Sequence, residues 1–246
     1  MHKTLISLLL SFLLCNSLDS ALHIILIGPP GSGKGTFVNL MSSISSFEQV
    51  NPGDLLRKEV KAQTDLGLQI QSRVAKGELV TNDIVWELVN QKLVKILSEK
   101  RPFILDAFPI SEENFLSLHA FIQNHPEEQF IFLRLVAAEE VCVQRICSRR
   151  TCSECGEVFN DITRIPKISN SCDRCAAPLT KRSDDILEHA VKRVENINQK
   201  IKRVVNCIQS HGFTVTEIDT NCSLSECHRK YTTLGIHDDH HPGRNF

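Results

Sequence analysis

The chain has no excess of either charge and no apolar run long enough to cross a membrane comfortably. Its 28 Lys and Arg residues are balanced by 29 Asp and Glu residues, so the formal net charge is −1. Without a global basic field, we do not expect the protein to bind nucleic acid. The apolar stretch Leu5–Leu14 has only ten residues, about half of what a spanning helix needs. No internal repeat is visible, and 246 residues with 41% hydrophobic content predict one packed core with insertions.

The most informative segment is glycine-rich and directly follows the apolar run Leu22–Ile27. Residues Gly28–Thr36 read G-P-P-G-S-G-K-G-T. A strand, a loop of this kind and a helix predict phosphate binding, because the loop amides converge on one anion and the helix N-terminus adds partial positive charge. Lys34 can reach the β- and γ-phosphates. The position after it is Gly35 rather than Ser or Thr, so the loop is a variant. The expected nucleotide contacts are Gly31, Gly33, Lys34, Gly35 and Thr36.

Four of the ten cysteines form two C-x-x-C pairs. The pairs are Cys152 with Cys155 and Cys172 with Cys175, and sixteen residues separate them. This spacing predicts a four-thiolate zinc site, which is structural because four protein ligands leave no open position for a catalytic water. Disulfides are the alternative. The other cysteines are expected to pack as small buried hydrophobic residues; they include Cys142, Cys147 and Cys207.

Short apolar runs alternate with helical patterns along the chain. Strands are expected at Leu22–Ile27, Phe103–Leu105, Phe130–Leu135 and Phe213–Ile218, and helices at Asp83–Leu97 and Asp185–Gln209. Continuous apolar runs are typical of strands that are buried on both faces of a parallel sheet. The pattern therefore predicts an α/β fold with a doubly wound parallel sheet and helices on both faces.

The variant loop resembles that of the nucleoside monophosphate kinases, and of adenylate kinase most of all. Further segments look like family motifs and occur in the family order: Asn51–Arg57 (N-P-G-D-L-L-R), Gly77–Val85 (G-E-L-V-T-N-D-I-V), Phe103–Pro109 (F-I-L-D-A-F-P), Arg145–Asn160, and Arg182–Asp185 followed by Arg193. Together they cover roughly residues 22–220. The resemblance implies a phosphate-loop kinase core over residues 21–220. It also implies a monophosphate-binding helical arm at 51–80, a zinc-bearing lid at 148–185 and a C-terminal tail at 221–246.

The first 20 residues do not fit this family. Met1-His2-Lys3 followed by Leu5–Leu14, with small residues near Ser17 and Ser20, resembles a secretory signal peptide. The alternative is a tolerated extension. Family resemblance implies a cytoplasmic monomer, whereas a working signal peptide implies export. The core is expected to begin near Ala21 under either interpretation.

Phosphoryl transfer depends on positioning and charge neutralisation, and the resemblance assigns several cations to the donor side. Arg145 and Arg149 would bind ATP, and their i, i+4 spacing predicts that both guanidinium groups lie on one face of a helix. Arg182 and Arg193 would clamp the transferring phosphoryl group. Asp106, at the end of an apolar strand, would hold Mg²⁺ through water.

Four positions within the motifs depart from the family, and all four lie on the acceptor side. Arg57 would hold the acceptor phosphate, but Ile110 stands where the family has a second Arg. A charge-assisted contact of that kind is worth roughly 1.5–3 kcal/mol. Ala107 replaces a Gly, and Pro52 and Asn114 replace the Thr and Gln that lie near the acceptor base. The full set of expected acceptor-site residues is Pro52, Asp54, Arg57, Val80, Ala107 and Asn114, with Asp54 also looking like the partner of Asp106.

Three functions remain open at this point. The first is an adenylate kinase that converts ATP and AMP to two ADP with Mg²⁺, with a weakened acceptor site. The second is an ATP-binding sensor or interaction module that has lost the transfer reaction. The third is a kinase for another nucleoside monophosphate.

Overall fold

The computed structural model describes residues 21–44, 46–75, 80–182 and 185–232. The signal-peptide-like extension, residues 76–79 of the expected arm, residues 183–184 of the expected lid and residues 233–246 of the tail lie outside these ranges. Within the described part of the chain, none of the helices combines the length and the apolar character that a membrane span requires.

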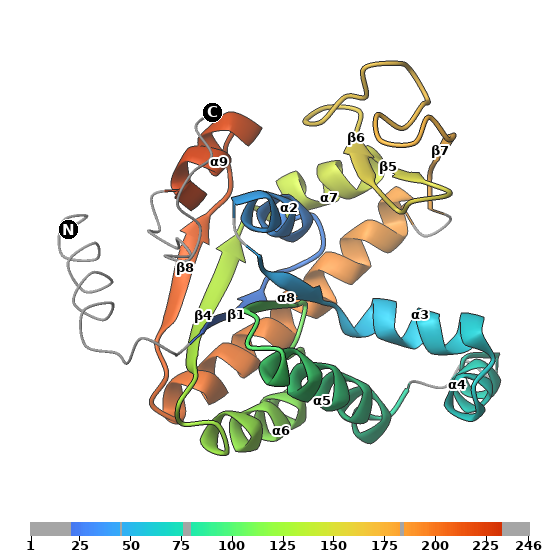
Figure 1. Cartoon of the computed structure of the whole chain (residues 1–246). Helices are drawn as coiled ribbons and strands as arrows, with labels where there is room; N and C mark the ends of the chain where they lie inside the picture. The colour runs from blue at the N-terminus through green and yellow to red at the C-terminus, as the bar shows by residue number, and fades with distance from the viewer. Residues whose placement is uncertain (1–20, 45, 76–79, 183–184, 233–246) are drawn as a thin grey trace.

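Five parallel strands form the central sheet, in the order β2-β3-β1-β4-β8 (Figure 1). They are β1 (Leu22–Ile27), β2 (Glu48–Val50), β3 (Phe103–Asp106), β4 (Gln129–Val136) and β8 (Val215–Asp219). Residues of β3 are buried throughout, as are all residues of β1 after Leu22, as the continuous apolar runs predict. The last strand begins two residues later than the sequence suggested, at Val215.

Helices cover both faces of this sheet. Successive residues of a strand point to opposite faces, and in β1 both sets of side chains from Ile24 onward are apolar and buried. Ile25 and Ile27 face α5 (Asn82–Ser98), α6 (Glu112–Gln123) and α8 (Leu187–Ser210). Ile24 and Leu26 face α2 (Lys34–Ile44) and α9 (Leu224–Thr232). The predicted doubly wound α/β fold is therefore confirmed.

Two details at the ends of the core differ from the sequence-based expectation. Helix α8 begins at Leu187 rather than Asp185, and the side chain of Leu187 is exposed. The core also does not end at residue 220. Helix α9 packs on α2, where the ring of Tyr231 is buried and meets Phe37 edge-on at a centroid distance of 4.9 Å.

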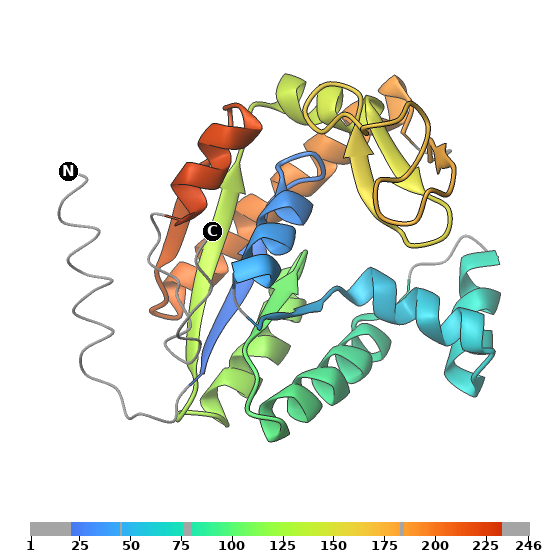
Figure 2. The same ribbon diagram turned by 45° about the horizontal axis from the view of Figure 1, so that its top comes forward.

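Two inserted units project from the same side of the core (Figure 2). The arm consists of α3 (Pro52–Ala62) and α4 (Asp65–Ala75). Asn51 caps α3 by accepting a hydrogen bond from the Asp54 amide, and Pro52 occupies its first turn, where no amide donor is needed. At Gly67 the two helices touch so closely that a Cβ atom would lie 2.1 Å from the Glu59 carbonyl oxygen.

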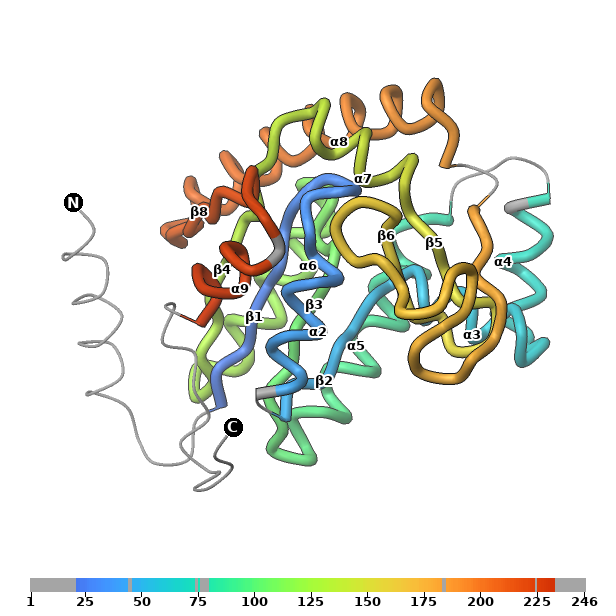
Figure 3. The backbone as a smooth tube through the Cα atoms, turned by 90° about the horizontal axis from the view of Figure 1, so that it is seen from above, coloured from blue at the N-terminus to red at the C-terminus, as the bar shows by residue number. Residues whose placement is uncertain are grey.

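The second unit follows α7 (Glu139–Cys147) and contains a small antiparallel sheet. Its strands are β5 (Arg149–Cys152), β6 (Val158–Asn160) and β7 (Leu179–Thr180), in the order β6-β5-β7. We call residues 148–185 the lid, after the sequence-based expectation. Seen from above, the lid strands lie between α7 and the arm helices (Figure 3).

Candidate active site

The glycine-rich loop joins β1 to α2, as its sequence predicts. Gly31 has φ +81° and Gly33 has φ +94°, which is a backbone region that favours glycine. A Cβ atom at Gly31 would lie 2.3 Å from the carbonyl oxygen of Cys142 on α7. Only glycine lets the loop pass this close to α7, so the loop is shaped by its neighbour as well as by its own sequence.

The Lys34 ammonium lies inside this loop. Its Nζ donates hydrogen bonds to the carbonyl oxygens of Gly28 (2.7 Å) and Pro29 (2.9 Å). Burial lowers the pKa of Lys34, while the nearby Asp106 carboxylate opposes that effect. The side chain is therefore held where oxygens of a bound phosphate would meet the loop amides.

Asp106 ends β3 beside the loop, where it pairs in register with Leu26 of β1. Its Oδ2 accepts hydrogen bonds from the side-chain amides of Gln49 (3.0 Å) and Asn51 (3.1 Å). Its Oδ1 is buried and accepts none within the described ranges. Sequence reasoning did not assign a role to Gln49, nor to the side chain of Asn51. The available signal was their position at the carboxyl end of β2, next to β3 in the sheet.

Arg145 and Arg149 do not share a helix face, so that prediction is wrong. Helix α7 ends at Cys147, and Ser148 caps it before the chain enters β5. Arg145 donates to the backbone oxygens of Gly31 (3.3 Å), Thr220 (2.8 Å) and Cys222 (3.2 Å). Both arginines nevertheless line the same cleft.

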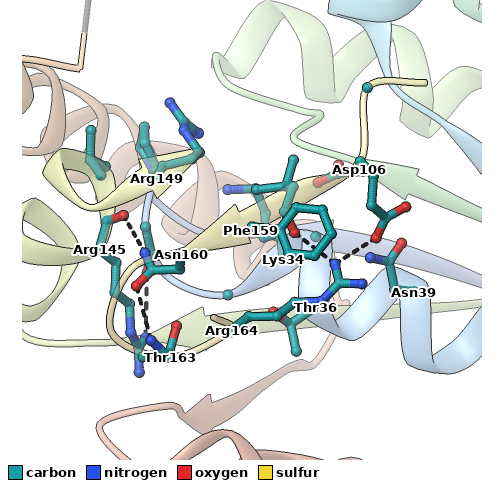
Figure 4. A pocket seen from close by; sticks show the side chains of 18 of the residues that line it. Lys34, Thr36, Asn39, Asp106, Arg145, Arg149, Phe159, Asn160, Thr163 and Arg164 are labelled. Carbon is teal, nitrogen blue, oxygen red and sulfur yellow. Dashed lines mark hydrogen bonds and ion pairs between the residues drawn. The ribbon is translucent and has the colours of Figure 1, made fainter. Parts of the chain in front are cut away.

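A further group of side chains reaches the cleft from the lid (Figure 4). Arg164 donates to the Glu157 carboxylate (2.5 Å) and to the Val158 carbonyl (2.6 Å), and its guanidinium lies 4.8 Å from the centre of the Phe159 ring. Asn160 donates to the Arg145 carbonyl at 2.9 Å. Sequence reasoning missed these residues, because nothing in their spacing shows that this part of the lid turns toward the phosphate loop.

The cleft has a volume of about 600 Å³ and is lined by the glycine-rich loop, the arm, the lid and helix α9. The expected nucleotide-site residues that line it are Gly31, Gly33, Lys34, Gly35, Thr36, Asp54, Arg57, Asp106, Arg145, Arg149 and Arg182. Five other expected nucleotide-site residues lie outside this lining: Pro52, Val80, Ala107, Asn114 and Arg193. Arg193 lies 3.5 Å from Asp185. Asn114 is buried, donates to Asn82 and accepts from the Ile110 amide at 3.2 Å.

The four lid cysteines lie together, with all their sulfur atoms within 4.8 Å of one another. The Sγ atoms of Cys152 and Cys175 are 3.4 Å apart, and those of Cys155 and Cys172 are 3.6 Å apart. All four are free thiols, so the disulfide alternative is not seen here. A hydrogen bond from the Cys155 amide lowers the pKa of Cys152 to about 6, while hydrogen bonds with neighbouring thiols raise the pKa of Cys175. Cys152 is therefore the cysteine of the two that more readily carries the thiolate that a metal ion needs.

The two C-x-x-C segments have the same backbone hydrogen bonds. The amide of the first cysteine donates to the fifth residue after it, Glu157 or Ala177, at 2.9 Å in both segments. The amide of the fourth residue, Gly156 or Ala176, returns a hydrogen bond to that cysteine. This repeated turn brings both sulfur atoms of each segment to one side, as a shared metal ion requires.

Known proteins resemble the chain over most of its length. A model of the family described as adenylate kinase matches residues 26–213. The adenylate kinase of Kosmotoga olearia is 37% identical over 195 residues, which are 79% of this chain and 90% of that one. This chain belongs to the adenylate kinase family. The adenylate kinase of Thermotoga petrophila is 34% identical over 195 residues (78% and 87% of the two chains), and that of Pyrococcus abyssi is 30% identical over 205 residues (83% and 91%).

Membership of the adenylate kinase family settles the class of the protein. It is a nucleotide-binding phosphotransferase, a nucleoside monophosphate kinase. No comparison favours the ATP-binding module or a kinase of another monophosphate. The four-cysteine cluster is compatible with zinc.

Proposed function

We propose that the protein transfers a phosphoryl group reversibly between ATP and AMP, giving two ADP. The observation that carries this proposal is the charge of the cleft. Lys34 of the glycine-rich loop, Arg57 of the arm, and Arg149 and Arg182 of the lid all line one cavity. Two nucleotides that meet end to end bring several negative charges together, and their reaction depends mainly on neutralising and aligning those charges.

On the donor side, the loop amides and Lys34 hold the β- and γ-phosphates of ATP. Arg145 and Arg149 bind the donor from α7 and from the start of the lid. Arg182 and Arg193 act on the transferring phosphoryl group. Movement of the lid over the phosphates would exclude water and so prevent the hydrolysis of ATP.

Mg²⁺ is the metal that accompanies ATP in this family, and the residues around Asp106 fit it. Gln49 and Asn51 occupy one carboxylate oxygen, while Oδ1 is buried without a hydrogen-bond partner in the described part of the chain. Such an oxygen suits a hydrated hard cation. Bound Mg²⁺ would neutralise the donor phosphate oxygens. Asp54, the expected partner, instead forms an ion pair with Arg57 at 2.5 Å.

Zinc fits the lid cysteines in a structural role. Four sulfur atoms that surround a zinc ion at bonds of about 2.3 Å are about 3.8 Å apart. Three of the six observed separations are 3.4–3.6 Å, close to that value, and all six are within 4.8 Å. Cys152, Cys155, Cys172 and Cys175 would hold the ion and fix the two turns of the lid against each other.

AMP is the proposed acceptor. It should bind less tightly here than in a site where two arginines hold its phosphate. Arg57 reaches the cleft, whereas Ile110 is 39% exposed and lies outside the lining. Pro52, Val80, Ala107 and Asn114 are assigned to the acceptor nucleoside. Ala107 has φ +60°, the left-handed region that favours the family's glycine.

The test is a coupled assay of ADP formation by the purified, zinc-loaded chain, with AMP compared against the other nucleoside monophosphates. Turnover with AMP is expected, and Lys34→Ala should lower it by roughly 100-fold or more with the fold intact. ATP binding without turnover on any monophosphate would refute the proposal and favour the ATP-binding module.

We further propose that the protein is a monomer. Its location depends on residues 1–20: cytoplasmic if they are a tolerated extension, exported if they act as a signal peptide. Light scattering measures the first property, and a reporter enzyme fused to residues 1–20 measures the second.

A further inference from the structure

Two cysteines outside the zinc cluster share one wall of the donor cleft. Cys222 precedes helix α9, Cys227 lies within its first turns, and both line the cavity. Cys222 is half-buried, whereas Cys227 is 5% exposed. Both are free thiols.

The Cys227 thiol lies against the backbone of Cys222 and against the two carbonyls that hold Arg145. The Cys227 sulfur donates to the backbone oxygens of Thr220 and Cys222, at 3.8 Å in both cases. Burial, and then a hydrogen bond with the Cys222 thiol, raise the pKa of Cys227 to about 12. The same two carbonyl oxygens accept hydrogen bonds from the Arg145 guanidinium, at 2.8 and 3.2 Å.

We propose that Cys222 and Cys227 form an oxidisable thiol pair, which hydrogen peroxide converts to a disulfide that weakens nucleotide binding in the donor cleft. The effect on binding rests on the proposed function, because it requires ATP in this part of the cleft. Formation of the disulfide does not.

The chemistry needs one peroxide molecule. The thiolate of Cys222, the more exposed of the two, attacks one peroxide oxygen; the O–O bond breaks, and hydroxide leaves and takes up a proton to become water. The sulfur becomes a sulfenic acid. The sulfur of Cys227 then attacks it, the S–O bond breaks, and the departing hydroxide takes the Cys227 proton. Two thiols and one peroxide thus yield one disulfide and two water molecules, with two electrons passing from sulfur to oxygen.

The disulfide acts on the donor site through Arg145. An S–S bond is about 2.05 Å long, much shorter than a contact between two thiols, so the segment from Thr220 to Cys227 must tighten. This moves the carbonyl oxygens that orient the Arg145 guanidinium. Loss of one well-placed charged contact weakens binding roughly tenfold. Bound nucleotide covers the cleft wall and should slow the oxidation.

The experiment treats the zinc-loaded chain with stoichiometric hydrogen peroxide, alkylates the remaining thiols and digests the protein with trypsin. The fragment Val204–Arg229 contains both cysteines and also Cys207. Cleavage after Glu217 separates Cys207, which serves as the internal control. ATP affinity is measured by calorimetry before oxidation, after it and after dithiothreitol, in the wild type and in Cys222→Ser, Cys227→Ser and the control Cys207→Ser.

We expect a Cys222–Cys227 disulfide, a roughly tenfold loss of ATP affinity, reversal by dithiothreitol and slower oxidation when ATP is present. Cys207→Ser should behave like the wild type, and either serine variant should keep the affinity that it had before peroxide. Release of zinc is followed in parallel, because the cysteine thiolates that bind zinc also react with peroxide. Absence of the disulfide, unchanged affinity after it forms, or an equal loss in the serine variants would overturn the proposal. A protein that forms the disulfide and loses ATP affinity, but never turns over AMP, would contradict only the proposed function.

Discussion

Arg149 and Asp185 close the lid at its base through a two-point ion pair. The Arg149 Nε lies 2.8 Å from one carboxylate oxygen and its Nη2 lies 2.6 Å from the other. The Asp185 carboxylate is fully buried, and Arg193 approaches it at 3.5 Å. Arg149 lies at the start of the lid and Asp185 ends it, while Arg193 belongs to helix α8. The Asp185 carboxylate therefore links both ends of the lid to α8.

Asp185→Asn should therefore destabilise the protein strongly. The substitution keeps the shape but leaves the Arg149 guanidinium without its partner charge, which costs about 3 kcal/mol for a buried pair. Chemical denaturation measures the loss. The matched control is Asp161→Asn, which breaks the more exposed pair with Arg150 on the same lid and should cost at most about 1 kcal/mol. Equal losses in both variants would contradict a special role for the base of the lid.

Cys172→Ser should abolish stable zinc binding. Cys172 is buried among the lid residues Cys152, Phe159 and Leu179, and a hydroxyl is a poor substitute for a thiolate ligand. Metal analysis should fall from about one zinc per chain to near zero, and limited proteolysis should cut the lid faster. Cys147→Ser, which changes a half-buried thiol on α7, should keep its zinc. Zinc retained at full occupancy in Cys172→Ser would refute the four-thiolate site.

Ala176→Gly should strengthen the lid slightly. Ala176 has φ +60° at the position where the matching turn has Gly156, with φ +72°. A side chain in this left-handed region costs about 1 kcal/mol, and glycine removes that cost apart from its own entropy loss. We expect Ala176→Gly to stabilise the lid by about 0.5 kcal/mol. Gly156→Ala should destabilise it by a similar amount or more. Competition with a zinc chelator checks both variants, and a loss of affinity in Ala176→Gly would contradict the expectation.

The sequence predicted the features that are formed by residues close together in the chain. The glycine-rich loop and the two cysteine turns are each complete within a few residues, so their spacing alone predicted where they lie. The contacts of Gln49 and Asn51 with Asp106 could not be predicted, because the order of β2 and β3 in the sheet brings them together. Arg149 was placed on a helix because no Gly or Pro marks the end of α7 at Ser148. Helix α9 was missed because its sequence is mostly polar. It packs on the core mainly through Cys227 and Tyr231.

Ile110→Arg should improve the use of AMP. Ile110 is partly exposed next to the expected acceptor site, and a second guanidinium on the acceptor phosphate is worth roughly tenfold to a hundredfold in affinity. The KM for AMP should fall by that factor while the KM for ATP stays the same. Leu116→Arg places the same charge at an exposed apolar position on α6, outside the cleft, and should change neither constant. Unchanged kinetics in Ile110→Arg would show that another group already holds the phosphate.

The stability of the protein should fall as the pH drops below the ordinary pKa of histidine, because His23 is buried in its neutral form. The Phe103 amide donates to Nδ1 at 3.3 Å, so this nitrogen carries no proton, and Nε2 is the donor to Glu128 at 3.1 Å. Burial lowers the pKa of His23 to about 3. The unfolded chain takes up this proton near pH 6.5, whereas the folded chain does not, so the stabilisation is complete above pH 6.5 and is lost as the pH falls towards 3.

Each unit of pH in this window should change the free energy of unfolding by up to about 1.4 kcal/mol on account of His23. Burial raises the pKa of Glu128, which acts in the opposite sense in the lower part of the window and reduces the slope there. His23→Gln keeps a donor and an acceptor but cannot titrate. Denaturation of both proteins between pH 4 and 7 should therefore give a shallower dependence for the variant, and His189→Gln, a change at an exposed histidine at the start of α8, should leave the wild-type slope intact. Parallel slopes for His23→Gln and the wild type would mean that the buried imidazole is not the group that titrates on unfolding.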